Sequence, residues 1–153
     1  MGASQPEHSI TAAQLFAIAN PVALAGWLLL AFAVIRRNAH LRDVVAGRWW
    51  PLGFAALYTL LILLFFGGSP GGFDTLANVQ LLFTSPWAAL AGWIHYLAFD
   101  LFMGALVARR VMEAGASRWW LAGLLPATFL FGPMGFLASE IVLLFTRPQT
   151  HSA

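Results

Sequence analysis

The 153-residue sequence contains no cysteine, and only 9% of its residues are charged. Without cysteine the chain has no disulfide, no thiolate metal ligand and no cysteine nucleophile. A soluble domain carries about 25% charged residues, so this chain has too little charge to cover a water-exposed surface. Because 60% of the residues are hydrophobic, the composition predicts an integral membrane protein. All eight basic residues are arginine and the formal net charge is only +2, which gives no indication of nucleic-acid binding.

Four apolar segments are long enough to cross a bilayer, which takes about 20 residues of helix. They lie near residues 11–35, 50–67, 87–108 and 119–145. Runs of this length without dyad alternation predict helices and not a barrel. We therefore expect an all-α, four-transmembrane-helix bundle that forms a single membrane domain over residues 1–153. A short interfacial helix is expected at about 74–83, capped by Asp74, and Ser85-Pro86 is typical of the start of a helix.

The distribution of arginine predicts the orientation of the bundle. Most arginines lie in two of the predicted loops: Arg36, Arg37, Arg42 and Arg48 in the 36–49 loop, and Arg109, Arg110 and Arg118 in the 109–118 loop. The 68–86 loop contains no basic residue. Because cytoplasmic loops are enriched in arginine and lysine, both arginine-rich loops are expected in the cytoplasm. Four crossings then place the N- and C-termini outside.

Two short segments recur along the chain. The sequence Ala-Leu-Ala-Gly-Trp at 23–27 returns at 89–93, and Arg-Trp-Trp at 48–50 returns at 118–120. In an alanine- and leucine-rich chain this is either coincidence or the trace of two parallel helical-hairpin repeats, related by an axis along the membrane normal. Under the second interpretation, His95 aligns with Leu29 and Asp100 with Val34, so only the second hairpin carries ionisable groups.

The third predicted span contains two ionisable side chains near its middle, His95 and Asp100. An Asp near the centre of a membrane helix costs about 2.5–3.5 kcal/mol on insertion scales, so such a group normally faces protein or water and indicates a functional site. At 100° per residue the two side chains are about 140° apart around the helix, and each requires its own partner. Asp100 shares its face with Trp93, Tyr96 and Gly104.

Further polar groups lie at similar depths in other spans. Asn20 is level with His95, and Thr128 is level with Asp100. Glu140 is expected near the outer surface. For Asp100 the structural alternative is a clamp between helices and the functional one is a general acid. For His95 the alternatives are a satisfied polar residue, or a base, proton relay or ligand. With a single deep histidine, a bis-histidine haem or a multi-histidine metal site is not expected.

The last span is interrupted by Pro126 and by Gly132-Pro133 with Gly135. Proline removes a backbone donor and kinks a helix, which lipid tolerates where neighbours or a cavity satisfy the freed carbonyls. The interruption is therefore either a kink that packs against small residues or an opening wide enough for a ligand.

The sequence resembles the abscisic-acid-deficient-four-like family, whose plant members are plastid membrane proteins required for neoxanthin synthesis. Two motifs carry the resemblance. The first motif comprises Trp93, His95, Phe99, Asp100, Leu101, Phe102 and Gly104, and the second comprises Pro126, Phe129, Phe131, Gly132, Pro133 and Gly135. The spacing between Pro126 and Phe129 is shorter than in the plant pattern. The resemblance covers roughly residues 15–147, and the lack of a transit-peptide-like extension indicates a bacterial inner-membrane member.

The resemblance implies carotenoid chemistry. Neoxanthin forms from violaxanthin by isomerisation, in which an acid protonates an epoxide oxygen while a base removes a vinylic proton to give an allene. Asp100 would be the acid and His95 the base. Their separation around the helix is an objection to this pairing, unless the substrate passes between them or two chains share a site. No cofactor and no metal site are predicted, although an iron requirement stays open.

From these observations we expect a protein that acts on a carotenoid or a similar apolar polyene, with a site between the first, third and last spans. The candidate catalytic residues are His95 and Asp100, and the candidate substrate-binding residues are Asn20, Trp93, Tyr96, Phe99, Phe102, Thr128, Phe131, Gly132 and Pro133. The alternatives are a non-catalytic carotenoid- or lipid-binding accessory protein and a small proton-coupled carrier. The expected partners are the polyene and membrane lipid, and a homodimer would enlarge an enclosure that is small for a carotenoid.

Overall fold

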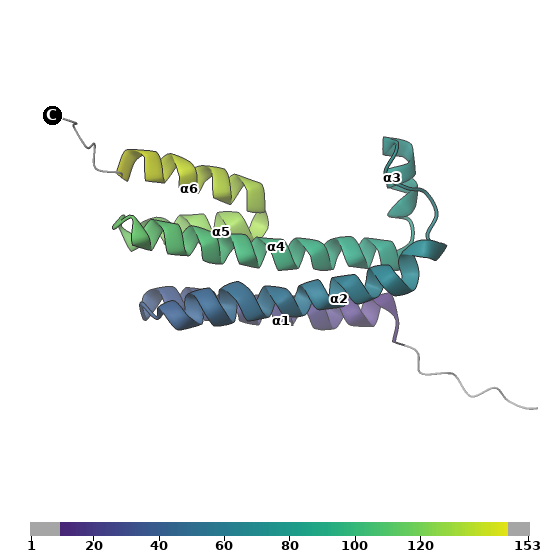
Figure 1. Ribbon diagram of the computed structural model, residues 1–153, viewed down its shortest axis with the longest axis horizontal. Helices are drawn as coiled ribbons and strands as arrows, with labels where there is room; N and C mark the ends of the chain where they lie inside the picture. Colours follow the sequence, from purple (N-terminus) through teal and green to yellow (C-terminus); the bar gives the residue numbers. More distant parts are fainter. Residues whose placement is uncertain (1–9, 147–153) are drawn as a thin grey trace, which may run out of the picture.

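A computed structural model describes residues 10–146, and within that range the chain is helical without β-strands. The elements are α1 (Ala12–Ile35), η1 (His40–Trp49), α2 (Trp50–Phe65), η2 (Phe66–Gly68), α3 (Leu76–Leu82), α4 (Pro86–Glu113), η3 (Arg118–Trp120), α5 (Leu121–Leu130) and α6 (Gly132–Thr146). Three helical segments are long and apolar enough to cross a membrane, namely α1, the continuous helix from η1 through η2, and α4. They run side by side along the long axis of the molecule (Figure 1).

Two of the helix starts follow from local sequence. Ser85 caps α4 by accepting a hydrogen bond from the N–H of Ala88 (3.4 Å), and Pro86 occupies the first turn, as predicted. A helix is present within the predicted range 74–83, namely α3 (Leu76–Leu82), which stands across one end of the bundle (Figure 1); its location at the membrane interface stays a prediction. Its cap is Thr75 and not Asp74, because the Thr75 hydroxyl accepts from the N–H of Asn78 (3.2 Å). The Asp74 carboxylate instead accepts from the Asn78 side chain (2.9 Å), which lowers the pKa of Asp74.

The second span begins earlier than predicted. Residues 40–49 were expected in a loop, but they form the π-helix η1 and run directly into α2. The charged pair in this segment explains the difference. Arg42 is only 6% exposed, and its Nε and Nη2 atoms each lie 2.7 Å from a carboxylate oxygen of Asp43. Because each charge is compensated by its neighbour, the segment packs against α4, where Arg42 Nη1 lies 3.2 Å from Sδ of Met112.

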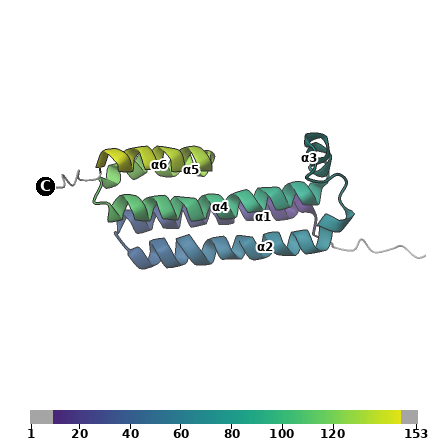
Figure 2. The same ribbon diagram turned by 45° about the horizontal axis from the view of Figure 1, so that its top comes forward.

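The predicted fourth span at 119–145 is not a crossing. It forms a hairpin in which α5 runs to the middle of the bundle and α6 returns beside it (Figures 1 and 2). The helix stops at Phe131, whose backbone leaves the helical region (φ −147°, ψ 67°), and Pro133 has no N–H with which to continue it. The prediction of four full spans is therefore wrong. The prediction of two repeated helical hairpins is wrong as well, because α4, the first helix of the second hairpin, has no full-length partner helix after it.

The hairpin also changes the predicted topology. We call the end of the bundle where α1 and α4 finish the arginine-rich end. The chain termini lie outside the described residues, but Ala12 and Thr146 lie at opposite ends of the bundle, with Thr146 at the arginine-rich end (Figure 1). The prediction of both termini outside would place these two residues at the same end, whereas the described chain brings them to opposite ends. Glu140 likewise lies at the arginine-rich half and not near the outer surface, because Arg110 of α4 forms an ion pair with it (Nη2–Oε2 3.0 Å).

Helix α4 is the centre of the molecule. In the most apolar stretch of α4, 56% of the residues are buried, against 39% in α1 and 17% in the η1–α2 helix. One buried cluster joins α4 to α1, η1, α5 and α6, and a second joins α4 to α1 and α2. In lipid such contacts are held by close packing and small residues. At Gly104 an added Cβ would lie 2.6 Å from Cζ3 of Trp27, so glycine is required for this approach.

Candidate functional site

Asp100 lies in the middle of α4 and faces the break between α5 and α6. Asp100 is 7% exposed, and its Oδ2 atom is buried without a hydrogen-bond partner among residues 10–146. The Oδ1 atom packs on the backbone of Gly132, where an added Cβ would overlap it. Because buried polar groups are normally hydrogen-bonded, this unpartnered carboxyl oxygen makes Asp100 a candidate site residue.

Tyr96 lies one turn before Asp100 on α4 and contacts the same break. Its hydroxyl lies 3.0 Å from the carbonyl oxygens of both Phe129 and Leu130. In an uninterrupted helix these carbonyls would accept from the N–H groups of residues 133 and 134. Pro133 has no N–H, and the N–H of Met134 donates to the Phe131 carbonyl instead. The Tyr96 hydroxyl therefore supplies a donor to carbonyls that the break has freed, which holds the turn of the hairpin against α4.

Aromatic side chains extend the site in both directions along α4. Trp93 donates from Nε1 to Oδ1 of Asn20 on α1 (2.8 Å), and its ring stacks on Tyr96 with centroids 5.4 Å apart. On the other side of Asp100, Trp27 of α1 fills the space over Gly104 and meets Phe129 edge-to-face at 5.4 Å. We call the surface formed by Trp93, Tyr96, Asp100 and Gly104 the Asp100 face. It meets α1 and the broken hairpin, which are the elements predicted to enclose the site.

His95 lies on a different face of α4. Its side chain is exposed, with its ring centroid 4.6 Å from that of Phe99 and 5.4 Å from that of Tyr58 on α2. No hydrogen bond of His95 occurs within the described part of the chain. Phe102 is also exposed on this side. The structure therefore separates His95, Phe99 and Phe102 from Asp100, in agreement with the 140° estimated from helix geometry.

The remaining predicted residues form the hairpin itself. Thr128 is fully buried, donates its hydroxyl to the Leu124 carbonyl (2.7 Å) and packs against Gly135, so it joins the two helices of the hairpin. Gly132 is buried beneath Asp100, whereas Phe131 is 59% exposed and Pro133 is exposed as well. Among these positions, Gly132 is the one that contacts the buried carboxyl directly.

An apolar groove of about 590 Å³ runs between α1 and α5, and we call it the α1/α5 groove. Its wall includes Trp27, Pro126 and Phe129. Neither Trp27 nor Phe129 was among the residues predicted for the site. The available signal was Gly104, since a glycine on the face of a buried Asp indicates that a large side chain from another helix approaches there. Among the described residues, no group of three His, Cys, Asp or Glu side chains is placed to hold a metal ion.

The arrangement suits a ligand that is mostly apolar. A neutral carboxyl at Asp100 could donate a proton or a hydrogen bond, and a charged one could accept, at a position that is only 7% exposed. The α1/α5 groove is connected to the Asp100 face through Trp27, which lines the groove and packs over Gly104.

The ABA4-like family model, described as ABA DEFICIENT 4-like, matches residues 14–138. The matched range runs from α1 into α6 and therefore includes the whole Asp100 face and the break in the hairpin. No curated protein and no solved structure matches the chain.

Proposed function

The chain belongs to the ABA DEFICIENT 4-like family, and from this premise we propose that it is an integral membrane protein that transforms a carotenoid or a similar apolar polyene. The observation that carries the proposal is the buried carboxyl of Asp100, whose Oδ2 has no partner among the described residues. Such a group is costly in a bilayer and is expected to persist where it has a function. The arginine-rich end would face the cytoplasm of a bacterial inner membrane.

The chemistry follows the resemblance to proteins of neoxanthin synthesis. A neutral Asp100 would donate its proton to an epoxide oxygen as the C–O bond breaks, and a base would take a vinylic proton as the allene forms. The substrate and the product are isomers, so no oxidant or reductant is consumed. The apolar side chains around Asp100 would exclude water, which would otherwise open the epoxide by addition.

His95 as the base stays a prediction with a specific structural requirement. Because His95 and Asp100 occupy different faces of α4, one substrate end cannot touch both without passing around the helix. A homodimer that brings His95 of one chain to the polyene held by the other would meet this requirement. Asp100 alone therefore carries the proposal.

The separation of His95 from Asp100 also favours a second candidate function, binding without catalysis. The α1/α5 groove is mostly apolar, with Arg118 as its one charged lining residue, and neither His95 nor Asp100 lines it. A non-catalytic carotenoid- or lipid-binding protein, which presents its ligand to another enzyme, would have this architecture.

Expression in a carotenoid-producing host separates the two candidates. If the chain is an enzyme, pigment extracts change with the wild-type protein and revert with Asp100→Asn, which keeps the shape of the side chain but removes the acid. Glu113→Gln is the matched control, because Glu113 lies at the exposed end of the same helix. If the chain is a binder, the pigments are unchanged but carotenoid co-purifies with the protein. Unchanged pigments together with pigment-free protein contradict both candidates.

A further inference from the structure

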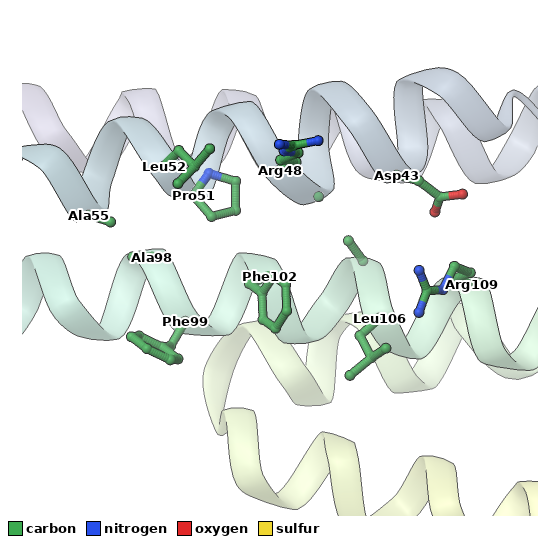
Figure 3. Close-up of a pocket in the computed structure, with 12 residues that line it drawn as sticks. Asp43, Arg48, Pro51, Leu52, Ala55, Ala98, Phe99, Phe102, Leu106 and Arg109 are labelled. Carbon is green, nitrogen blue, oxygen red and sulfur yellow. The ribbon is translucent and has the colours of Figure 1, made fainter.

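A second groove, of about 630 Å³, lies between the η1–α2 helix and α4 (Figure 3). We call it the α2/α4 groove. Along most of its length the walls are apolar, and they include Leu52, Ala55, Ala98, Phe99, Phe102 and Leu106. Toward the arginine-rich end the lining includes three charged residues: Arg48 near the level of Phe102, then Asp43 and Arg109, which lie across the groove from each other (Figure 3). The groove is therefore amphipathic along its axis, with three charged lining residues against one, Arg118, in the α1/α5 groove.

The charged end carries an excess of positive charge. Both carboxylate oxygens of Asp43 are held by Arg42 at 2.7 Å, so this acidic group is already compensated. Arg109 is 3.9 Å from Glu113, a distance beyond hydrogen bonding, and Arg48 has no ion pair among residues 10–146. Two guanidinium groups, one from each wall, thus line the charged part of the groove without a closely bound carboxylate.

The length of the groove matches one leaflet of a bilayer. Phe99 and Arg109 are ten residues apart on α4, which corresponds to about 15 Å along the helix. The hydrocarbon core is about 30 Å thick, so the groove extends from the headgroup level to about the middle of the membrane. A carotenoid, which is about as long as the whole core is thick, would extend beyond it.

From the charge and the length together we propose that the α2/α4 groove binds one anionic phospholipid. Its phosphate lies between Arg48 and Arg109, and one acyl chain lies along Phe102 and Phe99 toward the membrane centre. Arginine presents a planar fork of donors to phosphate oxygens, and basic pockets between membrane helices bind acidic lipid headgroups in this way. Phe99 and Phe102 then contact lipid and not the polyene.

Native mass spectrometry of the detergent-purified full chain tests this proposal, with phosphatidylglycerol and phosphatidylcholine as probes of matched acyl chains. The wild-type protein is expected to retain phosphatidylglycerol preferentially. Arg48→Gln/Arg109→Gln is expected to lower that affinity about thirtyfold, since each basic group near the surface contributes about fivefold. The double variant Arg36→Gln/Arg37→Gln removes the same charge outside the groove and is expected to retain the preference.

The apolar part of the groove is tested separately. Ala55→Phe would fill the acyl-chain path, whereas Ala56→Phe adds the same volume on the exposed side of α2. Only Ala55→Phe is expected to weaken phosphatidylglycerol binding, and circular dichroism establishes that both variants are helical. Equal affinity of the wild type for the two lipids overturns the proposal. The proposal is also overturned if the two double arginine variants lose phosphatidylglycerol affinity equally, or if the two phenylalanine variants do. None of these results depends on whether a polyene is transformed.

Discussion

Gly132→Ala tests whether Asp100 packs against the break in the hairpin. The added Cβ would overlap Oδ1 of Asp100 and would lie 2.9 Å from its Cγ, where carbon atoms normally stay about 3.5–4.0 Å apart. Relief requires Asp100 to leave its rotamer or α6 to move away from α4. Overpacking of this kind costs about 1–3 kcal/mol, which is about a 5- to 150-fold fall in the ratio of folded to unfolded protein.

Gly123→Ala in α5 is the matched control, because a Cβ there meets no atom within 4 Å. In an open helical position the change from glycine to alanine stabilises by about 0.5–1 kcal/mol. The free energy of unfolding of each variant is measured in mixed detergent micelles, with increasing dodecyl sulfate and circular dichroism as the signal.

A double-mutant cycle assigns the cost of Gly132→Ala to the carboxyl. In an Asp100→Ala background the overlapping atoms are gone, so Gly132→Ala is expected to lose most of its cost, leaving a coupling energy of about 1–3 kcal/mol. If Gly132→Ala is tolerated as well as Gly123→Ala, or if its cost is the same without the carboxyl, then the packing described for Asp100 is incorrect.

Three further predictions concern the hairpin. Because the chain has no cysteine, Thr146→Cys and Gly72→Cys can be labelled singly in vesicles with a membrane-impermeant maleimide. The two cysteines are expected to react from opposite sides of the membrane. Reaction of both from the same side would instead support a fourth crossing by residues 119–145. Glu140→Arg is expected to destabilise the fold by about 1 kcal/mol, with recovery on adding Arg110→Glu; failure of this exchange to recover stability argues against the ion pair. Tyr96→Phe is expected to cost about 1–3 kcal/mol in unfolding free energy, since freed carbonyls lose their donor; a neutral effect contradicts that role.

Two of the spans, α1 and α4, and the buried acid could be predicted from sequence because each depends on local properties. Length and hydropathy locate α1 and α4 to within a few residues, and Ser85-Pro86 marks the start of α4. Helix geometry alone places Asp100 with Tyr96 and away from His95. These inferences require only that the segments be helical and surrounded by lipid.

The fourth span could not be predicted in the same way. An apolar run specifies its surroundings but not its direction, and residues 119–145 are apolar whether they cross or return. The reversal depends on Phe131 leaving the helix and on a hydroxyl from another helix, Tyr96, reaching the freed carbonyls. That second condition is tertiary, and the sequence around Pro133 does not contain it.

The start of the second span was missed for an electrostatic reason. Arg42 and Asp43 indicate a loop when each is counted as a separate charge. As a bidentate pair they compensate each other, and the helix continues through them. Trp27 was missed as a site residue because it is remote from both motifs in sequence and contacts Gly104 only through tertiary packing.

The proposed function requires the Asp100 carboxyl to act on a polyene in the membrane. Its most direct test is the rate at which purified protein in lipid vesicles converts an epoxy-carotenoid, with products separated by chromatography and identified by mass. We expect an isomer of unchanged mass from the wild type and from Glu113→Gln, and a loss of at least about a hundredfold in rate for Asp100→Asn, the lower range for removal of a general acid. Equal rates for the wild type and Asp100→Asn would contradict the account.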